Sequence, residues 1–123
     1  MTAPHMASIW PTDITLKKSQ RLLEVTFEDG VTYCLPAEYL RVESPSAEVQ
    51  GHGAGQKKTL GGMRHIGFSG VEPVGNYALR IIFDDGHDSG LYTWETLYRL
   101  GRDQDKIWTD YLMALARDGL SRD

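Results

Sequence analysis

The densest group of side chains with chemical potential is residues 84–88, Asp-Asp-Gly-His-Asp. Imidazole nitrogens and carboxylate oxygens are ligands for Zn²⁺ and Fe²⁺, and two neighbouring carboxylates can move protons. A structural explanation competes, because Asp-Gly favours a tight turn and His87 can hydrogen-bond to the nearby backbone. A tight metal site needs three or four converging ligands, and the sequence does not show such convergence. The first interpretation of residues 84–88 is therefore a tight turn, with a metal site as the alternative.

The sequence patterns for other phosphate-binding or catalytic sites are weaker. The glycine-rich residues 51–59 lack the glycine that a phosphate-binding loop needs directly before its lysine, because Gln56 precedes Lys57. The serines lie outside any Gly-x-Ser-x-Gly elbow. The only cysteine, Cys34, falls in a predicted strand, where a buried thiol is generally inert. These patterns favour a protein without catalysis of its own.

Short strands and tight turns must position these residues. Asp29-Gly30 and Asp85-Gly86 each supply hairpin-turn chemistry between apolar runs. Alternation of apolar and polar residues predicts strands at 14–17, 22–27, 31–35, 64–74, 77–83 and 91–94. Helical spacing predicts helices near 37–42, 94–100 and 104–118. The fold class is therefore α+β, a small antiparallel β-hairpin sheet with short helices and a C-terminal helix packed on one side.

The two halves of the chain repeat one order of elements: strand, acidic Gly turn, strand and short helix. Duplication and recurrence of a good hairpin design both explain this repeat. Residues 1–12 predict a flexible N-terminal tail, and residues 13–118 predict a single domain. Within that domain, residues 45–62 predict a mobile loop, because they hold five glycines and few apolar side chains.

Composition limits the functional classes. The chain has 123 residues, and its 13 basic and 17 acidic residues give a net charge of −4. It therefore lacks the basic excess of an electrostatic nucleic-acid binder. One cysteine excludes an internal disulfide framework. Without a signal-peptide pattern or an apolar run of about 18 residues, we expect a cytoplasmic protein with no membrane partner.

Residues 74–94 resemble the gamma-butyrobetaine hydroxylase-like N-terminal domain family. The resemblance rests on an apolar strand that enters Asp85-Gly86-His87 and is followed by an aromatic-rich strand and helix. The first half agrees through Asp29-Gly30, a proline and Tyr39-Leu-Arg41. The similarity covers roughly residues 10–101 and implies a stand-alone bacterial member of the family.

The resemblance implies two contexts for the domain. In carnitine-pathway hydroxylases it precedes an iron- and 2-oxoglutarate-dependent catalytic domain and binds structural zinc through three cysteines and one histidine. Elsewhere it stands alone in bacteria or is joined to Mrp-type ATPases that carry iron–sulfur clusters. This chain has no room for either catalytic domain, so hydroxylase activity is not carried over.

The zinc motif of the family transfers only in part. His87 matches the family histidine, whereas Ser44, Ser46 and Val49 stand at the positions of the three cysteines. Neutral hydroxyls are poor zinc ligands beside thiolates, and valine offers no ligand. We therefore expect no cofactor. If the chain keeps the family architecture, Ser44, Ser46 and His87 should form a polar pocket closed by hydrogen bonds.

The sequence favours a non-catalytic accessory or protein-interaction module with an unknown protein partner. Its link to iron–sulfur cluster handling is implied by the resemblance alone. Arg41, Asp85 and Trp94 are the candidates for partner contact. The alternative is a metal-binding module that uses His87 and neighbouring acidic residues as a weak iron or zinc carrier. A small enzyme with its site at the same turn is a third hypothesis.

Overall fold

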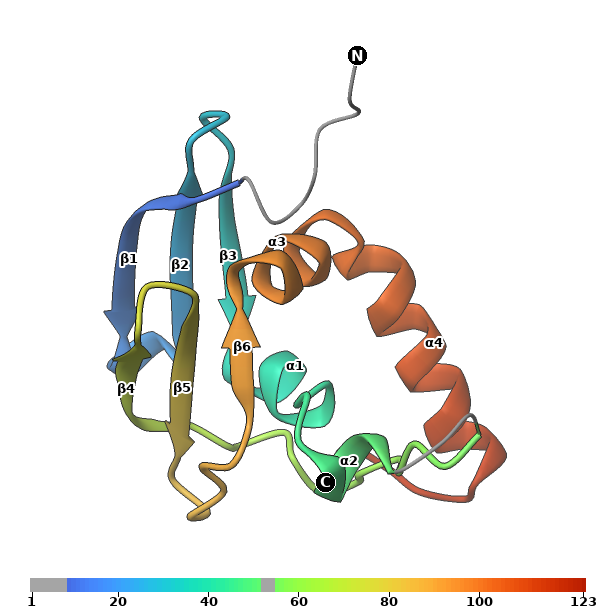
Figure 1. Ribbon diagram of the computed structural model, residues 1–123. Coiled ribbons are helices and arrows are strands. Elements are labelled where there is room, and N and C mark those ends of the chain that lie inside the picture. The colour runs from blue at the N-terminus through green and yellow to red at the C-terminus, as the bar shows by residue number, and fades with distance from the viewer. Residues whose placement is uncertain (1–8, 52–54) are drawn as a thin grey trace.

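The computed structural model describes residues 9–51 and 55–123 and contains two antiparallel three-stranded sheets, each followed by helices (Figure 1). The first half comprises β1 (Pro11–Lys17), a 3-10 turn (Lys18–Gln20), β2 (Leu22–Phe27), β3 (Thr32–Pro36), α1 (Ala37–Val42) and α2 (Ala47–Gln50). The second half comprises β4 (Phe68–Val74), β5 (Ala78–Phe83), β6 (Leu91–Thr93), α3 (Trp94–Arg102) and α4 (Gln104–Arg117). The predicted α+β class with antiparallel hairpins is confirmed, but the strands form two sheets instead of one.

Both predicted hairpin turns contain a glycine that needs a left-handed backbone. The φ angles are 86° at Gly30 and 89° at Gly86, a region that side chains disfavour. In the second turn, the Gly86 N–H donates to the Phe83 carbonyl at 3.1 Å, and the Phe83 N–H donates to the His87 carbonyl at 3.0 Å. The turn therefore fixes the backbone at His87.

Several predicted boundaries differ from the structure. The first strand begins at Pro11, inside the predicted tail, because the Glu28 N–H donates to the Trp10 carbonyl at 2.9 Å and extends the pairing of β1 with β2. β4 begins at Phe68 instead of residue 64, since the Ile66 N–H closes a turn onto Met63. Residues 1–8 of the predicted tail lie outside the described residues.

Part of the segment predicted as a loop at residues 45–62 is regular. It contains α2, and Val49 in this helix is 1% exposed. The Lys58 N–H donates to the Val49 carbonyl at 2.7 Å, which returns the chain to the helix. Residues 52–54 lie outside the described part of the chain. Mobility of the segment stays a prediction.

The two sheets bury their apolar faces in one shared core. Its members come from the strands of both sheets and from α1 and α3, and include Leu23, Val25, Phe27, Leu35, Leu40, Leu79, Ile81, Phe83, Leu97 and Leu100. Among the described helices, none is long and apolar enough to cross a membrane.

Buried tyrosines join the helices of one half to elements of the other. The Tyr92 hydroxyl on β6 donates to the Leu40 carbonyl in α1 at 2.5 Å. The Tyr39 hydroxyl in α1 donates to the Leu100 carbonyl in α3 at 2.7 Å. Burial raises the pKa of both tyrosines, so both hydroxyls remain protonated donors. The two halves are therefore interlocked (Figure 1).

α3 also packs closely on the first sheet. The rings of Phe27, Tyr33 and Tyr98 meet edge to face, with centroids 5.0–6.1 Å apart. A Cβ atom at Gly101 would lie 2.3 Å from Cγ of Tyr33, so only glycine allows this approach. Gly101 therefore sets the distance between α3 and β3.

α4 packs on α1 through aromatic and apolar contacts. The rings of Trp108 and Tyr39 are 6.2 Å apart, and Tyr111 and Leu115 form a small core with Val42. Arg122, after the helix, donates from Nε and Nη2 to the buried Glu38 carboxylate at 2.9 and 2.6 Å. The C-terminal segment is thus tied to the first half.

The Gly101→Ala variant should lose up to about 2 kcal/mol in free energy of unfolding, measured with urea. Overpacking against the Tyr33 ring costs about 1–3 kcal/mol and outweighs the gain of ~1 kcal/mol in helix propensity. Gly70→Ala is the control, because nothing lies within 4 Å of a Cβ at that position. Equal stability of the two variants would contradict the proposed close approach of α3.

Candidate functional site

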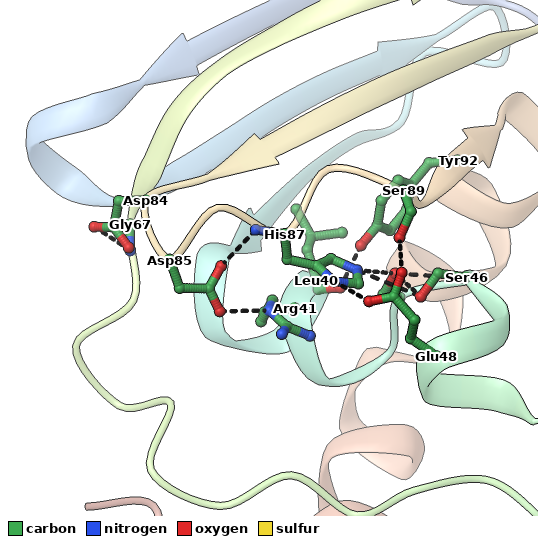
Figure 2. Close-up of polar contacts among 11 residues, drawn as sticks. Leu40, Arg41, Ser46, Glu48, Gly67, Asp84, Asp85, His87, Ser89 and Tyr92 are labelled. Carbon is green, nitrogen blue, oxygen red and sulfur yellow. Dashed lines mark hydrogen bonds and ion pairs between the residues drawn. The ribbon is translucent and has the colours of Figure 1, made fainter.

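His87 lies in a buried polar cluster between the β5–β6 turn and the segment that links α1 to α2 (Figure 2). Its Nε2 atom is 2.9 Å from Ser44 Oγ and 3.4 Å from Ser46 Oγ. Ser44 Oγ also donates to Ser46 Oγ at 3.1 Å. The structure therefore brings together the three polar residues that the sequence placed in one pocket, and hydrogen bonds close it.

The other imidazole nitrogen faces a more exposed acid. His87 Nδ1 lies 3.5 Å from Glu48 Oε2, and Ser89 Oγ donates to Glu48 Oε1 at 2.7 Å (Figure 2). The Ser89 hydrogen bond and, more weakly, His87 lower the pKa of Glu48, although partial desolvation opposes them. Glu48 therefore links α2 to the turn as a carboxylate. Neither Glu48 nor Ser89 was predicted as a site residue, because neither stands in a motif of its own.

Asp85 fixes the turn to α1. Its Oδ1 accepts from the His87 N–H at 3.0 Å, and its Oδ2 accepts from Arg41 Nε at 3.0 Å. Burial by itself would raise the pKa of Asp85, but these two hydrogen bonds outweigh burial and lower it. The Arg41 side chain is only 11% exposed, and its guanidinium lies 6.0 Å from the Phe83 ring centroid. Arg41 is therefore largely buried beside Asp85, and its Nη1 atom is buried with no hydrogen-bond partner among the described residues.

The environment keeps His87 neutral. Burial is the main cause that lowers its pKa, and the Arg41 charge adds to it, whereas Glu48, Asp85 and Asp88 act in the opposite direction. A neutral imidazole can accept a hydrogen bond at Nε2 from a serine hydroxyl while its Nδ1–H donates to Glu48. The ring is thus satisfied on both sides.

The Ser44–His87–Glu48 connections resemble the order of a nucleophile, a base and an acid. Ser44, however, is 0% exposed. A Cβ atom at Gly90 would lie 2.5 Å from Ser44 Oγ, so the β5–β6 connection covers the hydroxyl closely. A substrate carbonyl cannot reach a covered oxygen. In this arrangement the three residues hold the turn to the helices.

The donor set does not fit the zinc site that the family resemblance implies. Two of the three cysteine positions present hydroxyls to His87, and the third holds Val49, a buried apolar side chain. In residues 9–51 and 55–123, no group of three His, Cys, Asp or Glu side chains is placed to hold a metal. The weak-carrier alternative based on His87 and its acidic neighbours has no support from this geometry.

Trp94 lies away from Arg41 and Asp85. Thr93 pairs with Ala78, so Trp94 and Tyr77 lie at one end of the β5–β6 hairpin, while Asp85 lies in the turn at the other end. The structure therefore brings Arg41 and Asp85 together and places Trp94 at a separate surface.

An open aromatic cleft surrounds Trp94. Its volume is about 290 Å³, and its walls are Trp10, Tyr77, Thr93, Trp94 and Glu95. The Tyr77 and Trp10 side chains are 51% and 41% exposed. Trp10 and Tyr77 were not predicted as site residues. Their only local signal is a large aromatic residue in a turn or before a strand. We call this cavity the aromatic cleft.

A larger cavity of about 460 Å³ lies beside α4. Cations and carboxylates both line it, and its Lys57 is already paired with the buried Glu43 at 2.6 Å. Its basic side chains outnumber its acidic ones, but Lys57, Arg117 and both carboxylates already belong to ion pairs. The aromatic cleft is therefore the surface with the clearer chemical character.

Comparison with known proteins supports the resemblance seen in the sequence. The family model for gamma-butyrobetaine hydroxylase-like, N-terminal, matches residues 14–98. No curated protein gives a significant match. Two similar NMR solution structures are 51% and 40% identical to this chain, each with a TM-score of 0.81. The matches cover 93% and 99% of this chain and 90% and 91% of the other chains.

A crystal structure from Acidithiobacillus ferrooxidans is also similar. It is of a protein with unknown function that belongs to the DUF971 family, and it is 36% identical with a TM-score of 0.64. The match covers 81% of this chain and 98% of that chain. The fold is therefore shared by chains of comparable extent.

The neutral state of His87 predicts a pH dependence of stability. Folding lowers the pKa of His87 from its ordinary value of 6.5. The unfolded chain therefore binds a proton on this imidazole more tightly than the folded chain does. The free energy of unfolding in urea should therefore fall between about pH 7.5 and about pH 5.5, and it should fall less in His87→Asn. His65→Asn, at an exposed position outside the cluster, should behave as wild type. Identical slopes for wild type and His87→Asn would contradict a buried neutral imidazole.

If the absence of thiolates is what prevents zinc binding, cysteines placed at Ser44 and Ser46 should create a zinc site. Wild type should show no stoichiometric change in its His87 ring signals on zinc titration, because hydroxyls are weak ligands. Ser44→Cys combined with Ser46→Cys should bind zinc and melt at a lower temperature after chelation. Tight zinc binding by wild type would mean that other ligands replace the thiolates.

Proposed function

The chain belongs to the gamma-butyrobetaine hydroxylase-like, N-terminal family, and on that premise we propose that it is a protein-interaction module without catalysis of its own. In this proposal the module acts by docking a partner protein. The observation that carries it is the aromatic cleft, where two large aromatic side chains remain about half exposed. Tyr and Trp are enriched at the energetically important positions of protein interfaces.

The state of the polar cluster supports a non-catalytic role. The hydroxyl nearest the imidazole is covered, and the imidazole is engaged on both sides. The cluster holds α1, α2 and the β5–β6 turn together, which is a structural task. Docking requires a surface with accessible side chains, and the aromatic cleft is such a surface.

We place the partner in iron–sulfur cluster handling. The support for this part of the proposal is the family resemblance, since related domains are joined to ATPases that carry such clusters. The domain would then present or position a cluster-handling protein without holding the cluster itself. This assignment fits a chain whose own metal-ligand positions hold serine and valine.

Photo-crosslinking in cells tests the docking surface. A photoreactive phenylalanine analogue in place of Tyr77 should give a discrete covalent adduct with one partner protein, because Tyr77 is the most exposed aromatic wall of the aromatic cleft. The same analogue at Thr109, an exposed position in α4, is the matched control and should give no such adduct.

Binding and metal analysis of the captured partner then test docking at the aromatic cleft and the link to iron–sulfur clusters separately. Purified partner should bind wild type and bind Tyr77→Ser at least tenfold more weakly, and its iron and sulfide content should identify a cluster protein. Equal binding of both forms would overturn the docking proposal. A partner without iron or sulfide would overturn only the link to clusters.

A further inference from the structure

We infer that the aromatic cleft binds a lysine or arginine side chain presented by the partner, with Glu95 as its counter-ion. This inference rests on the proposed function and names the chemistry that the docking surface recognises. Three features carry it: the fixed positions of the rings, the sign of the charge that lines the cleft and its size.

The rings come from three separate segments that the fold brings together. Trp10 directly precedes β1, Tyr77 lies in the β4–β5 turn and Trp94 begins α3. These segments meet at the same end of the β5–β6 hairpin (Figure 1). A cavity with aromatic walls on several sides is the arrangement that proteins use to surround a cationic group.

Each segment is held by hydrogen bonds from backbone or indole N–H groups, which do not use the ring faces. Trp94 Nε1 donates to the Asn76 carbonyl at 2.8 Å, and the Trp94 N–H donates to the Tyr77 carbonyl at 3.2 Å. The Trp10 N–H donates to Glu28 Oε1 at 3.1 Å. The cleft is therefore preorganised, which lowers the entropic cost of binding.

Gly75 supports the Tyr77 wall. Its φ angle is 54°, and a Cβ atom there would lie 3.1 Å from Cδ1 of the Tyr77 ring. Glycine thus allows both the turn and the seating of the ring against the backbone. An exposed tyrosine held in this way is a built feature of the surface.

The charge that lines the cleft favours a cation. Aromatic rings present negative faces, and Glu95 is the only charged residue among the five that form the walls. Thr93 Oγ1 is already engaged with the N–H and hydroxyl of Thr96, so it does not compete. Ring faces and one carboxylate complement an ammonium or guanidinium group.

The size of the cleft favours a single side chain. Pockets for drug-sized ligands range from about 300 to 1,000 Å³, and this cleft of about 290 Å³ lies at the lower limit of that range. A lysine or arginine side chain places an apolar stem against aromatic walls and carries its charge to the rim. Glu95, exposed at the start of α3, is the group that such a charge would meet.

The test uses three peptides that differ only at the central residue of Gly-Gly-X-Gly-Gly, where X is lysine, norleucine or glutamate. Binding is followed by the indole N–H signals of Trp10 and Trp94 at millimolar peptide, with Trp108 on α4 as an internal control. We expect the lysine peptide to shift Trp10 and Trp94 and to bind at least fivefold more tightly than norleucine. Added salt should reduce this preference.

Two charge-matched variants isolate the carboxylate. Glu95→Gln should lose most of the preference for lysine over norleucine, with only the contribution of the ring faces left, whereas Asp88→Asn, which removes one charge at the other end of the hairpin, should keep the full preference. Tyr77→Ser should weaken every peptide that binds. Each variant is compared with wild type at equal folded fraction, measured by thermal melting.

The outcomes separate this inference from the proposed function. Equal binding of lysine and norleucine by wild type, or no shift with lysine, would overturn the cationic ligand and leave docking to stand on the crosslinking result. A wild-type dimer that dissociates in Tyr77→Ser would overturn it by making a second copy the occupant. No adduct from Tyr77 together with no peptide shift would overturn both.

Discussion

Two hydrogen bonds from buried tyrosine hydroxyls to helix carbonyls hold the arrangement on which the rest of the molecule depends. Tyr92 on β6 donates to Leu40 in α1, and Tyr39 in α1 donates to Leu100 in α3. A buried hydroxyl or carbonyl left without a partner is costly, so neither helix can slide without breaking a bond that water cannot replace. Each half of the chain therefore fixes a helix of the other half. The geometry of the polar cluster and of the aromatic cleft depends on this constraint.

The polar cluster follows from that constraint. Once Tyr92 holds the end of α1, Arg41 and Ser44 are brought against the β5–β6 turn, where Asp85 and His87 meet them. Several hydrogen bonds join these segments, and because each is modest, they stabilise the fold only as a set that includes the acid–arginine pair.

The sequence predicted the local structure well and the long-range contacts only through the resemblance. Asp29-Gly30 and Asp85-Gly86 specify tight turns by their own chemistry, so the hairpins were predictable. The proximity of Ser44 to His87 followed from the family motif. The separation into two sheets was not visible, because strand alternation shows which face is buried but not which strand lies beside it. The aromatic cleft was missed because Trp10 and Tyr77 are far apart in sequence and have no shared pattern.

The two ends of the β5–β6 hairpin divide the physical tasks of the domain. At the turn, Ser44, Ser46 and His87 are buried and hydrogen-bonded to one another and Arg41 is paired with Asp85, so that end contributes stability. At the opposite end, hydrogen bonds hold the Tyr77 and Trp94 segments together, Tyr77 is 51% exposed and Trp94 is partly exposed at the edge of the core. Exposed aromatic area that the fold holds rigidly loses little entropy on association. A partner that covers it therefore gains the apolar contact at low cost, and Glu95 at the rim selects among partners by charge.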